Sequence, residues 1–281
     1  MVNSELITKI RSQHTPTAIM GILNVTPDSF SEDGRYFHQD AAVAHGMDMI
    51  KAGADIIDIG GESTRPGANP ISIDDELKRV IPVITSLRSS TDTCISIDTY
   101  KSTVARAALE KDADMINDIS GLTFDPEMVQ VASEFNVPVV IMHIKGTPQD
   151  MQTNPTYNDL MVELVDHFTK RIDFALAGGV KPENIILDPG IGFGKRINDN
   201  FEIIRNLNQI TELGFPVLLG PSRKSFLGLT LNLPPEDRVE GTAAAVSCGI
   251  LNGASIMRVH DVLEMKRVAV ITDHIRGALI E

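Results

Sequence analysis

Apolar runs rich in Ile, Val, Leu and Met recur along the whole chain, and each run ends at a polar residue. Several, such as VPVVIMHI at 137–144 and NIILDPG at 184–190, are apolar without alternation. A continuous apolar run is typical of a parallel strand that is covered on both faces. Because burying an unpaired polar group costs about 2–7 kcal/mol, we expect polar side chains at the strand ends and not within the strands. The eight runs end at Asn24, Glu62, Asp98, Asn117, His143, Asp188, Ser222 and His260.

Segments with a helical spacing of apolar residues separate these strands. One of them carries Leu160, Leu164, Phe168 and Ile172 and is stopped by Gly178. Strand and helix alternate eight times in 281 residues, and no linker or change of composition divides the chain. The pattern predicts one α/β domain, residues 1–281, folded as a (β/α)8 TIM barrel with its core strands between about 18 and 261. An open, doubly wound sheet is the alternative, although it would more often break into halves.

In a barrel the carboxyl ends of all strands meet at one rim, so the polar residues there are expected to face a common ligand. Three long, polar, turn-rich segments follow strands at that rim: 26–40, 62–73 and 145–159. Long loops in a compact domain are usually lids or binding loops. We expect the first two to close over the ligands. For the third, a merely mobile surface is the alternative.

The bulk composition excludes several partner classes. The formal net charge is −13, which argues against nucleic acid as a partner, because binding phosphate backbones needs a basic surface. No secretory signal is found at the N-terminus, and no stretch approaches the ~20 apolar residues that cross a bilayer. Cys94 and Cys248 stand in apolar stretches without a CxxC spacing, so both are expected to be buried thiols. We therefore expect a cytoplasmic protein without nucleic-acid or membrane partners.

Basic residues gather at the predicted rim, against the sign of the whole chain. Arg65, Lys224, Arg258 and His260 fall at or just beyond strand ends. An arginine can hold a phosphate with two hydrogen bonds, whereas a lysine acts as a point charge. With Asn24 nearby, this cationic cluster predicts a site for a polyanion.

Acidic and amide side chains form a second set at the same rim. Asp98, Asn117 and Asp188 end the third, fourth and sixth strands. A carboxylate accepts two donors in one plane and an amide both donates and accepts, so the set suits the edge of an amino-pyrimidinone heterocycle. A metal site remains an equal alternative on these residues alone. The glycines of DPGIGFGK match neither GxGxxG nor the Walker spacing, so they indicate a tight turn instead of a nucleotide loop.

Five ordered blocks along the chain resemble the dihydropteroate synthase family. They are GILNVTPDSFS at 21–31, GGESTRPGA at 60–68, DPGIGFGK at 188–195, SRKSFLG at 222–228 and RVHDV at 258–262. The resemblance implies a TIM barrel, usually a homodimer, that acts in folate synthesis. Its reaction joins 6-hydroxymethyl-7,8-dihydropterin diphosphate to p-aminobenzoate and yields 7,8-dihydropteroate and pyrophosphate. In this family sulfonamides compete with p-aminobenzoate.

The resemblance also implies residue roles. Asn24 matches the family's Mg²⁺ ligand, which makes Mg²⁺ the expected cofactor. One departure concerns Ser31-Glu32-Asp33-Gly34, where the family commonly has Ser-Asp-Gly-Gly, so either Glu32 or Asp33 is expected to join the metal. The other matches are Asp98, Asn117, Asp188, Lys224 and Met142 for the pterin pocket, Arg65, Arg258 and His260 for pyrophosphate, and Thr64, Pro66, Phe193 and Ser225 for p-aminobenzoate. With the cationic cluster, these matches predict Arg65, Lys224, Arg258 and His260 as the catalytic residues.

Two rival functions are open at this point. A methyltetrahydrofolate:corrinoid methyltransferase resembles this barrel and shares the pterin-reading acids and amide. It needs no grip on pyrophosphate, so STRPG and RVH argue against it. A non-catalytic pterin-binding paralogue would be expected to lack the anion or Mg²⁺ residues, and none of these is missing from the sequence.

Overall fold

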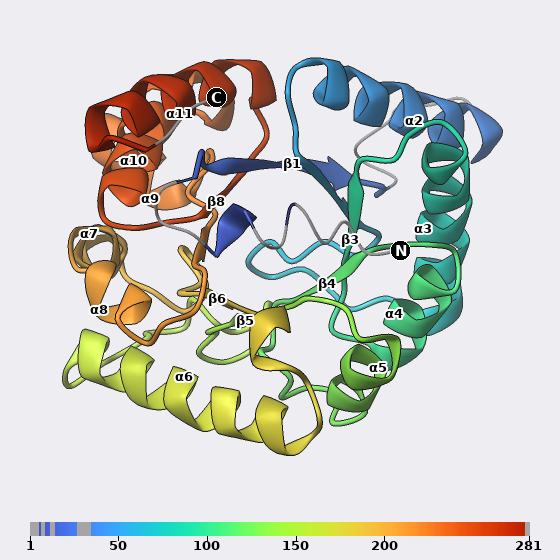
Figure 1. Cartoon of the computed structure of the whole chain (residues 1–281). Coiled ribbons are helices and arrows are strands. Elements are labelled where there is room, and N and C mark those ends of the chain that lie inside the picture. Colours follow the sequence, from blue (N-terminus) through green and yellow to red (C-terminus); the bar gives the residue numbers. More distant parts are fainter. Residues whose placement is uncertain (1–5, 7–8, 12–14, 27–34, 279–281) are drawn as a thin grey trace.

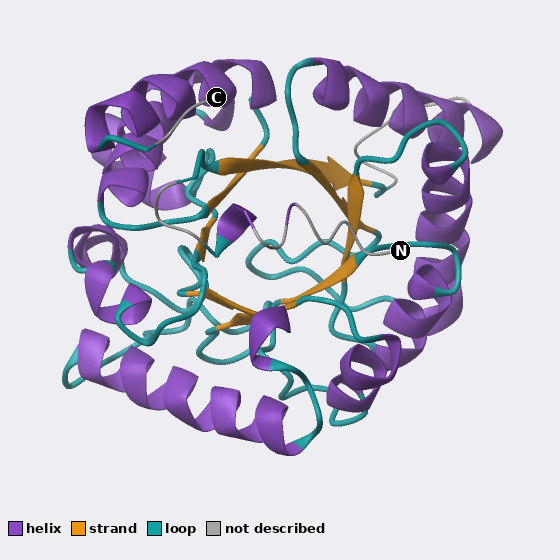
Figure 2. Ribbon diagram, viewed as in Figure 1, coloured by secondary structure: helices purple, strands orange, loops and turns teal. Residues whose placement is uncertain are grey.

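A ring of parallel strands surrounded by helices makes up the fold (Figures 1 and 2). The computed structural model describes residues 6, 9–11, 15–26 and 35–278. In this part of the chain each strand is followed by at least one helix, and all neighbouring strands run parallel. The predicted (β/α)8 barrel is therefore confirmed.

The elements have the following bounds. The strands are β1 (Ala18–Asn24), β2 (Ile56–Gly60), β3 (Cys94–Asp98), β4 (Met115–Asp118), β5 (Val139–Met142), β6 (Ile185–Asp188), β7 (Leu218–Leu219) and β8 (Ile256–Val259). The helices are α2 (Arg35–Lys51), α3 (Ile73–Arg88), α4 (Ser102–Leu109), α5 (Met128–Phe135), α6 (Leu160–Ala177), α7 (Ile197–Arg205), α8 (Asn208–Thr211), α9 (Ser225–Leu231), α10 (Val239–Leu251) and α11 (Val262–Arg276). Two 3-10 helices, Pro182–Asn184 and Pro235–Asp237, precede β6 and α10.

Contacts between β6 and the residues just before β7 close the ring. The strands pair in the order β6-β5-β4-β3-β2-β1-β8-β7, which leaves β6 and β7 as the two ends. A single parallel bridge joins Leu187 to Val217, and the amide of Leu187 donates to the carbonyl of Pro216 at 2.9 Å. Closure brings the carboxyl ends of all the strands to one rim.

The local sequence explains where the helices begin, and α3 is a clear case. The Ser72 side chain accepts a hydrogen bond from the amide of Asp75, which is a standard N-cap. Acidic residues follow in the first turn, where the helix dipole favours negative charge, and Arg88 stands in the last turn. Val80, Val83, Ile84 and Leu87 form the buried face of the helix.

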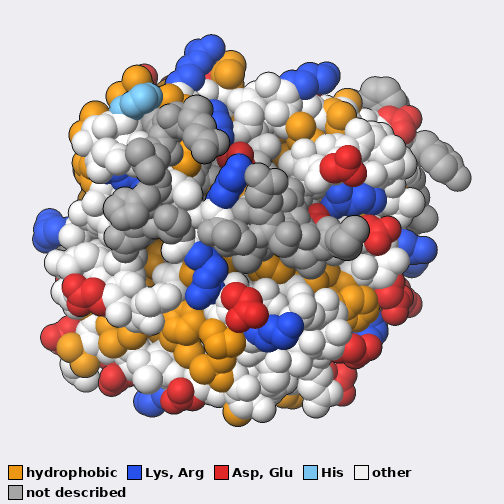
Figure 3. All heavy atoms as spheres, viewed as in Figure 1, with side chains coloured by type: hydrophobic (Ala, Val, Ile, Leu, Met, Phe, Trp, Pro, Cys, Tyr) orange, Lys and Arg blue, Asp and Glu red, His pale blue; other side chains and the backbone are white. Residues whose placement is uncertain are grey.

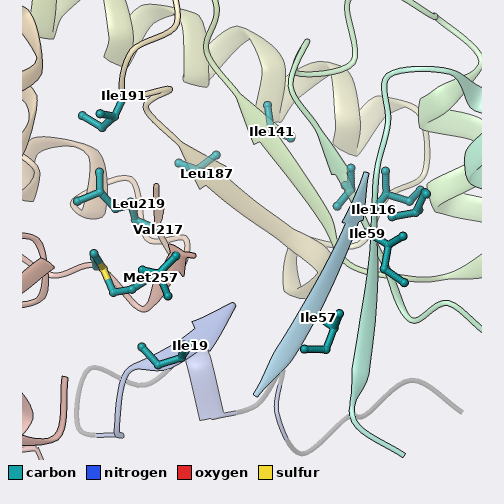
Figure 4. Close-up of a cluster of buried hydrophobic side chains, with 14 of the residues drawn as sticks. Ile19, Ile57, Ile59, Ile116, Ile141, Leu187, Ile191, Val217, Leu219 and Met257 are labelled. Atoms are coloured by element: carbon teal, nitrogen blue, oxygen red, sulfur yellow. The ribbon is translucent and has the colours of Figure 1, made fainter. Parts of the chain in front are cut away.

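Side chains at alternate positions of the strands pack into two separate hydrophobic cores. One set, which includes Ile57, Ile59, Ile116, Leu187 and Met257, packs between the strands and the helices (Figure 4). The other set forms a distinct apolar cluster inside the barrel at the beginnings of the strands. Its members are Ile10, Ala18, Met20, Ile56, Cys94, Met115, Val140, Ile186, Leu218 and Ile256. This second cluster is the apolar floor of the barrel.

Polar side chains begin directly above the apolar floor, one step further along the strands. Asp58 in the middle of β2 and Ser96 in the middle of β3 are fully buried, and the two residues are partners in register. The expectation that polar residues occur only at strand ends is thus wrong for these two. The Oδ2 atom of Asp58 is paired with Asn117 and Arg258, whereas its Oδ1 atom and Ser96 Oγ are buried without a hydrogen-bond partner among the described residues. The prediction for the cysteines holds for Cys94, whereas Cys248 is exposed because it stands on the outer side of α10.

Candidate active site

A small polar cavity lies at the carboxyl ends of the strands. It draws side chains from β3, β4, β5, β6 and β8 and from the loops after β2, β6 and β7. Eight of the predicted site residues meet at this cavity, which brings together segments that are distant in the sequence. The lining residues are Thr64, Asp98, Asn117, Ile119, Met142, Asp188, Ile191, Phe193, Gly220, Lys224 and Arg258.

The acids and the amide form one wall of the cavity. Asn117 and Asp188 are buried, and the Asp98 side chain is 10 % exposed. The Oδ1 atom of Asp188 accepts a hydrogen bond from the amide of Gly190 at 2.7 Å, which orients the carboxylate. Carboxylate and amide thus face a common space, as reading the edge of a flat heterocycle requires.

Asp58 is a member of this site that the sequence analysis did not identify. Its Oδ2 atom accepts hydrogen bonds from Arg258 Nε at 2.6 Å and from Asn117 Nδ2 at 2.9 Å. The Nη2 atom of Arg258 also donates to Asp98 Oδ2 at 2.7 Å. Arg258 therefore points into the barrel toward two carboxylates. The only sequence signal for Asp58 is an acid within the apolar run DIIDIGG.

The carboxylates of the cavity have pKa values well above the usual range. Burial raises the pKa of Asp98 to about 7, with Asp58 adding to the effect and Arg258 opposing it. Burial also raises the pKa of Asp188 to about 6, while Gly190 and Lys224 act in the opposite direction. Perturbed carboxylates that meet in one cavity are typical of functional sites.

Lys224 and Phe193 also line the cavity and contact each other. The lysine Nζ lies 4.1 Å from the centroid of the Phe193 ring, so the ammonium faces the aromatic ring. Burial lowers the pKa of Lys224 to about 8, and the nearby Arg258 lowers it further, while Asp188 and Asp98 oppose this. The cation therefore persists near neutral pH and is lost at moderately alkaline pH.

Other predicted residues lie around the cavity without lining it. Arg65 and Pro66 are exposed on the loop after β2, and Asn24 ends β1 at the rim. Ser225 lines a separate pocket of about 680 Å³ between α7 and α9. The candidate metal residues Glu32 and Asp33, together with most of the first loop, lie outside the described residues.

His260 is held by a neighbouring strand end. Its Nδ1 atom lies 3.0 Å from Ser222 Oγ, and its backbone amide donates to the same oxygen at 3.1 Å. Burial lowers the pKa of His260 to about 4, and Arg258 and Arg223 lower it further. The imidazole is thus neutral at pH 7 and differs in this from the expected cation. It can still donate a hydrogen bond to an anion.

A buried polar network anchors the loop that carries Thr64 and Arg65. Glu62 accepts hydrogen bonds from Tyr100 at 2.6 Å and from Lys101 at 2.5 Å. Lys101 also donates to Glu76 at 2.6 Å and to the carbonyl of Ile71 at 2.8 Å. The network ties both ends of the loop at 62–73 to α3 and to the start of α4. Its middle is held against the loop at 145–159, because the amide of Gly67 donates to the carbonyl of Pro148 at 2.9 Å and Gln149 Nε2 donates to Asn69 Oδ1 at 3.2 Å.

Lys195 joins the loops after β5 and β6. Its Nζ atom lies 3.0 Å from His143 Nδ1, and it donates to the carbonyls of Gly190 at 3.1 Å, Phe193 at 2.9 Å and His143 at 3.3 Å. Gly190 has φ of 70°, and a Cβ atom there would lie 2.0 Å from the His143 carbonyl. DPGIGFGK is therefore a tight turn whose glycine permits close contact with the neighbouring loop.

Replacing Lys195 by methionine should lower the free energy of unfolding by about 2–4 kcal/mol, since several buried acceptors would lose their donor. The midpoint and slope of urea unfolding would measure this change. Lys170→Met on the exposed side of α6 is the matched control and should change the stability little. Equal stability of the two variants would contradict a bridging role for Lys195.

Mg²⁺ is compatible with the described rim. The ion prefers oxygen ligands and is often held by one or two protein groups together with substrate phosphates. The side-chain oxygen of Asn24, at the end of β1, would be one such ligand. In the described part of the chain, no three His, Cys, Asp or Glu residues form a group that could hold a metal ion.

Comparisons with known proteins agree with this geometry. Residues 20–260 match the protein family described as pterin binding enzyme. The chain is 50 % identical over 258 residues to a dihydropteroate synthase of Synechocystis, an alignment that covers 92 % of this chain and 89 % of the relative. It is 43 % identical over 246 residues to the dihydropteroate synthase of Escherichia coli, covering 88 % of this chain and 87 % of the relative.

Solved structures show the same likeness. A dihydropteroate synthase of Clostridium difficile, crystallised with pteroic acid, matches with a TM-score of 0.89 and 48 % identity, over 93 % of this chain and 97 % of that one. A dihydropteroate synthase of Xanthomonas albilineans with 4-aminobenzoic acid matches with a TM-score of 0.88 and 42 % identity, over 94 % of each chain. The chain therefore belongs to the pterin-binding enzyme family, among its dihydropteroate synthases.

Proposed function

We propose that the chain condenses 6-hydroxymethyl-7,8-dihydropterin diphosphate with p-aminobenzoate, and that 7,8-dihydropteroate and pyrophosphate are the products. One observation carries the proposal. Asp98, Asn117 and Asp188 line the same cavity as Lys224 and Arg258. Acids to read a heterocycle and cations to receive its anionic leaving group are thus within reach of one bound substrate.

The acidic wall would bind the pterin ring. The Asp188 carboxylate accepts the exocyclic amine and the adjacent ring N–H, and Asn117 pairs with a neighbouring edge atom. Met142 supplies an apolar surface against the ring. Thr64, Pro66, Phe193 and Ser225 would receive p-aminobenzoate closer to the mouth, where Pro66 and Ser225 are exposed.

The reaction breaks one bond and forms another. The methylene carbon–oxygen bond breaks, and both electrons leave with the diphosphate oxygen. The amine nitrogen then donates its lone pair to the methylene carbon and loses a proton. Arg65, Arg258 and a hydrogen bond from His260 would stabilise the charge on the diphosphate, whereas Asp98 and Asp188 would favour a cationic pterin.

Asn24 would hold Mg²⁺ at the rim, with Glu32 or Asp33 as a further ligand by family resemblance. When bound, the ion would neutralise the diphosphate and make it a better leaving group. Arg65 and Arg258 would hold the diphosphate, while Lys224 and Phe193 would lie beside the pterin.

The pH dependence of kcat/KM should be bell-shaped. Asp188 and Asp98 must be ionised to accept hydrogen bonds from the pterin, so activity should rise as the pH passes their pKa values of about 6 and 7. It should fall above the pKa of Lys224, about 8, when the ammonium loses its proton. Lys224→Arg should move the alkaline limb upward, since guanidinium stays protonated. An unchanged alkaline limb in that variant would rule out Lys224 as its origin.

A direct assay tests the proposed reaction. The protein is incubated with the pterin diphosphate, p-aminobenzoate and Mg²⁺, and the release of pyrophosphate is followed. Release that needs both organic substrates supports the condensation. A corrinoid methyltransferase would instead transfer a methyl group from methyltetrahydrofolate, and a non-catalytic paralogue would bind the pterin without turnover.

A homodimer is the assembly that we propose, and an apolar surface on α10 and α11 supports it. Leu263, Val270, Ile271 and Ile275 recur along α11 at helical spacing and are exposed, as is Leu251 at the end of α10. Hydrophobic side chains are visible at the upper left of Figure 3, where these helices lie in Figure 1. Light scattering of the purified protein would measure its oligomeric state.

Membrane spans, surface charge and cellular location are the remaining aspects of the protein's surroundings. No helix in the described residues is long and apolar enough to span a membrane. On the face drawn in Figure 3, basic and acidic side chains are interspersed. The cytoplasmic location stays a prediction, which fractionation of cells that produce the protein would test.

A further inference from the structure

Arg258 reaches across the cavity in which a pterin is expected to bind. The side chain is 18 % exposed and reaches inward from β8 to two carboxylates on β2 and β3. The cavity that remains is about 20 Å³. One water molecule needs about 10–15 Å³, so this space accepts a water molecule and excludes a bicyclic ring. A pterin can therefore enter only if a lining side chain moves, and Arg258 is the one that reaches from β8 to the carboxylates of β2 and β3.

The two carboxylates that hold Arg258 differ in their freedom. Asp98 ends β3 at the cavity and is the acid expected to face the heterocycle. Asp58 lies deeper, beside Ser96 in register, and its side chain is fully buried. Asn117 Nδ2 fixes the same Oδ2 atom that binds Arg258 Nε. Asp58 is consequently the rigid partner and Asp98 the exchangeable one.

We propose that Asp58 is a positioning residue that acts through Arg258, as the fixed pivot of a latch formed by Asp58, Asp98 and Arg258. In the structure both carboxylates hold the guanidinium inside the cavity. When the pterin binds, it replaces Arg258 as the hydrogen-bonding partner of Asp98. The Nη2 end of Arg258 then swings toward the mouth of the cavity, while its Nε–H stays hydrogen-bonded to Asp58. The swing delivers the free end of the guanidinium to the diphosphate.

This inference rests on the proposed function, because it takes a pterin diphosphate as the ligand. It also explains why a strand interior carries a buried acid. A deep carboxylate can direct an arginine at a leaving group only if it is out of reach of both substrates, as Asp58 is.

A double-mutant cycle tests whether Asp58 acts through Arg258. Asp58→Asn should lower kcat about tenfold, as expected for loss of a charge-assisted hydrogen bond, and leave the KM for p-aminobenzoate unchanged. In an Arg258→Ala background the same substitution should have no further effect on kcat, because the group that it positions is gone. Ser96→Ala is the matched control: it alters the neighbouring buried side chain and should keep kcat within about twofold.

Arginine side-chain NMR follows the pivot without turnover. The Arg258 Nε–H signal, identified by its absence in Arg258→Lys, should exchange slowly with water in the wild type and in Ser96→Ala, and quickly in Asp58→Asn. It should persist when 6-hydroxymethyl-7,8-dihydropterin is added, while the Nη2 environment changes.

Three results would overturn the pivot. These are a slow Nε–H signal in Asp58→Asn, loss of the signal on adding the pterin, and kcat losses that multiply in the double variant. A wild-type protein that releases no pyrophosphate would defeat the proposed function instead. The NMR comparison of unliganded wild type with Asp58→Asn would still decide whether Asp58 holds Arg258.

Discussion

Replacing Asp188 by alanine should abolish measurable pterin affinity. The carboxylate is buried at the end of β6 and is oriented by the amide of Gly190. It is the group expected to accept two N–H donors of the ring, and those donors would be buried without a partner in the variant. An unpaired buried donor costs about 1–3 kcal/mol, so the loss of two predicts a fall in affinity of roughly hundredfold or more. Calorimetric titration with 6-hydroxymethyl-7,8-dihydropterin measures it.

The matched control for this experiment is Glu202→Gln. Glu202 lines the neighbouring pocket between α7 and α9, and it also loses a negative charge in its variant. Its pterin affinity should equal that of the wild type. If Asp188→Ala bound the pterin as tightly as the control, the assignment of this carboxylate to the heterocycle would be refuted.

Arg258→Ala should have a different signature, in which turnover falls steeply while binding of the pterin ring is largely kept. Truncation removes a cation that stabilises the departing diphosphate, a type of interaction whose loss typically lowers kcat by about 10²–10³-fold. The ring-reading acids remain in place, and the side chain that occupies the cavity is gone. Rapid-quench measurement of a single turnover, combined with calorimetry, separates the two effects.

Arg205→Ala on α7 serves as the control for charge, since it removes a guanidinium that lies outside the cavity. Normal turnover of Arg258→Ala at saturating substrate would contradict the role in the departure of diphosphate. A parallel loss of pterin-ring affinity would show instead that the arginine supports the ring itself.

Much of this molecule could be predicted from its sequence because barrel geometry is regular. Continuous apolar runs predicted the strands, and the rule that their carboxyl ends share one rim placed Asp98, Asn117, Asp188 and Arg258 together. The structure brings all four to one cavity. Local patterns of this kind specify an element and its polar end, and closure of the sheet brings these polar ends together.

Pairings between distant side chains were beyond the sequence. Arg258 was expected to bind an anion at the rim, but its partners in the structure are Asp58 and Asp98, which belong to strands far away in the chain. Nor does any local pattern reveal that Lys195 bonds to His143, or that burial neutralises His260. Such facts depend on which groups share a low-dielectric interior, and only the folded arrangement determines that.

The apolar floor closes one end of the barrel, and this determines how ligands enter and leave. Among the described residues, side chains such as Met20, Ile56 and Ile256 fill the end of the barrel where the strands begin, so substrates and products enter and leave at the opposite end. Whatever binds deepest must arrive first and depart last. We therefore expect ordered binding, in which the bicyclic substrate binds before the aromatic amine. An excess of amine should not inhibit its own reaction by occupying the deepest part of the cavity.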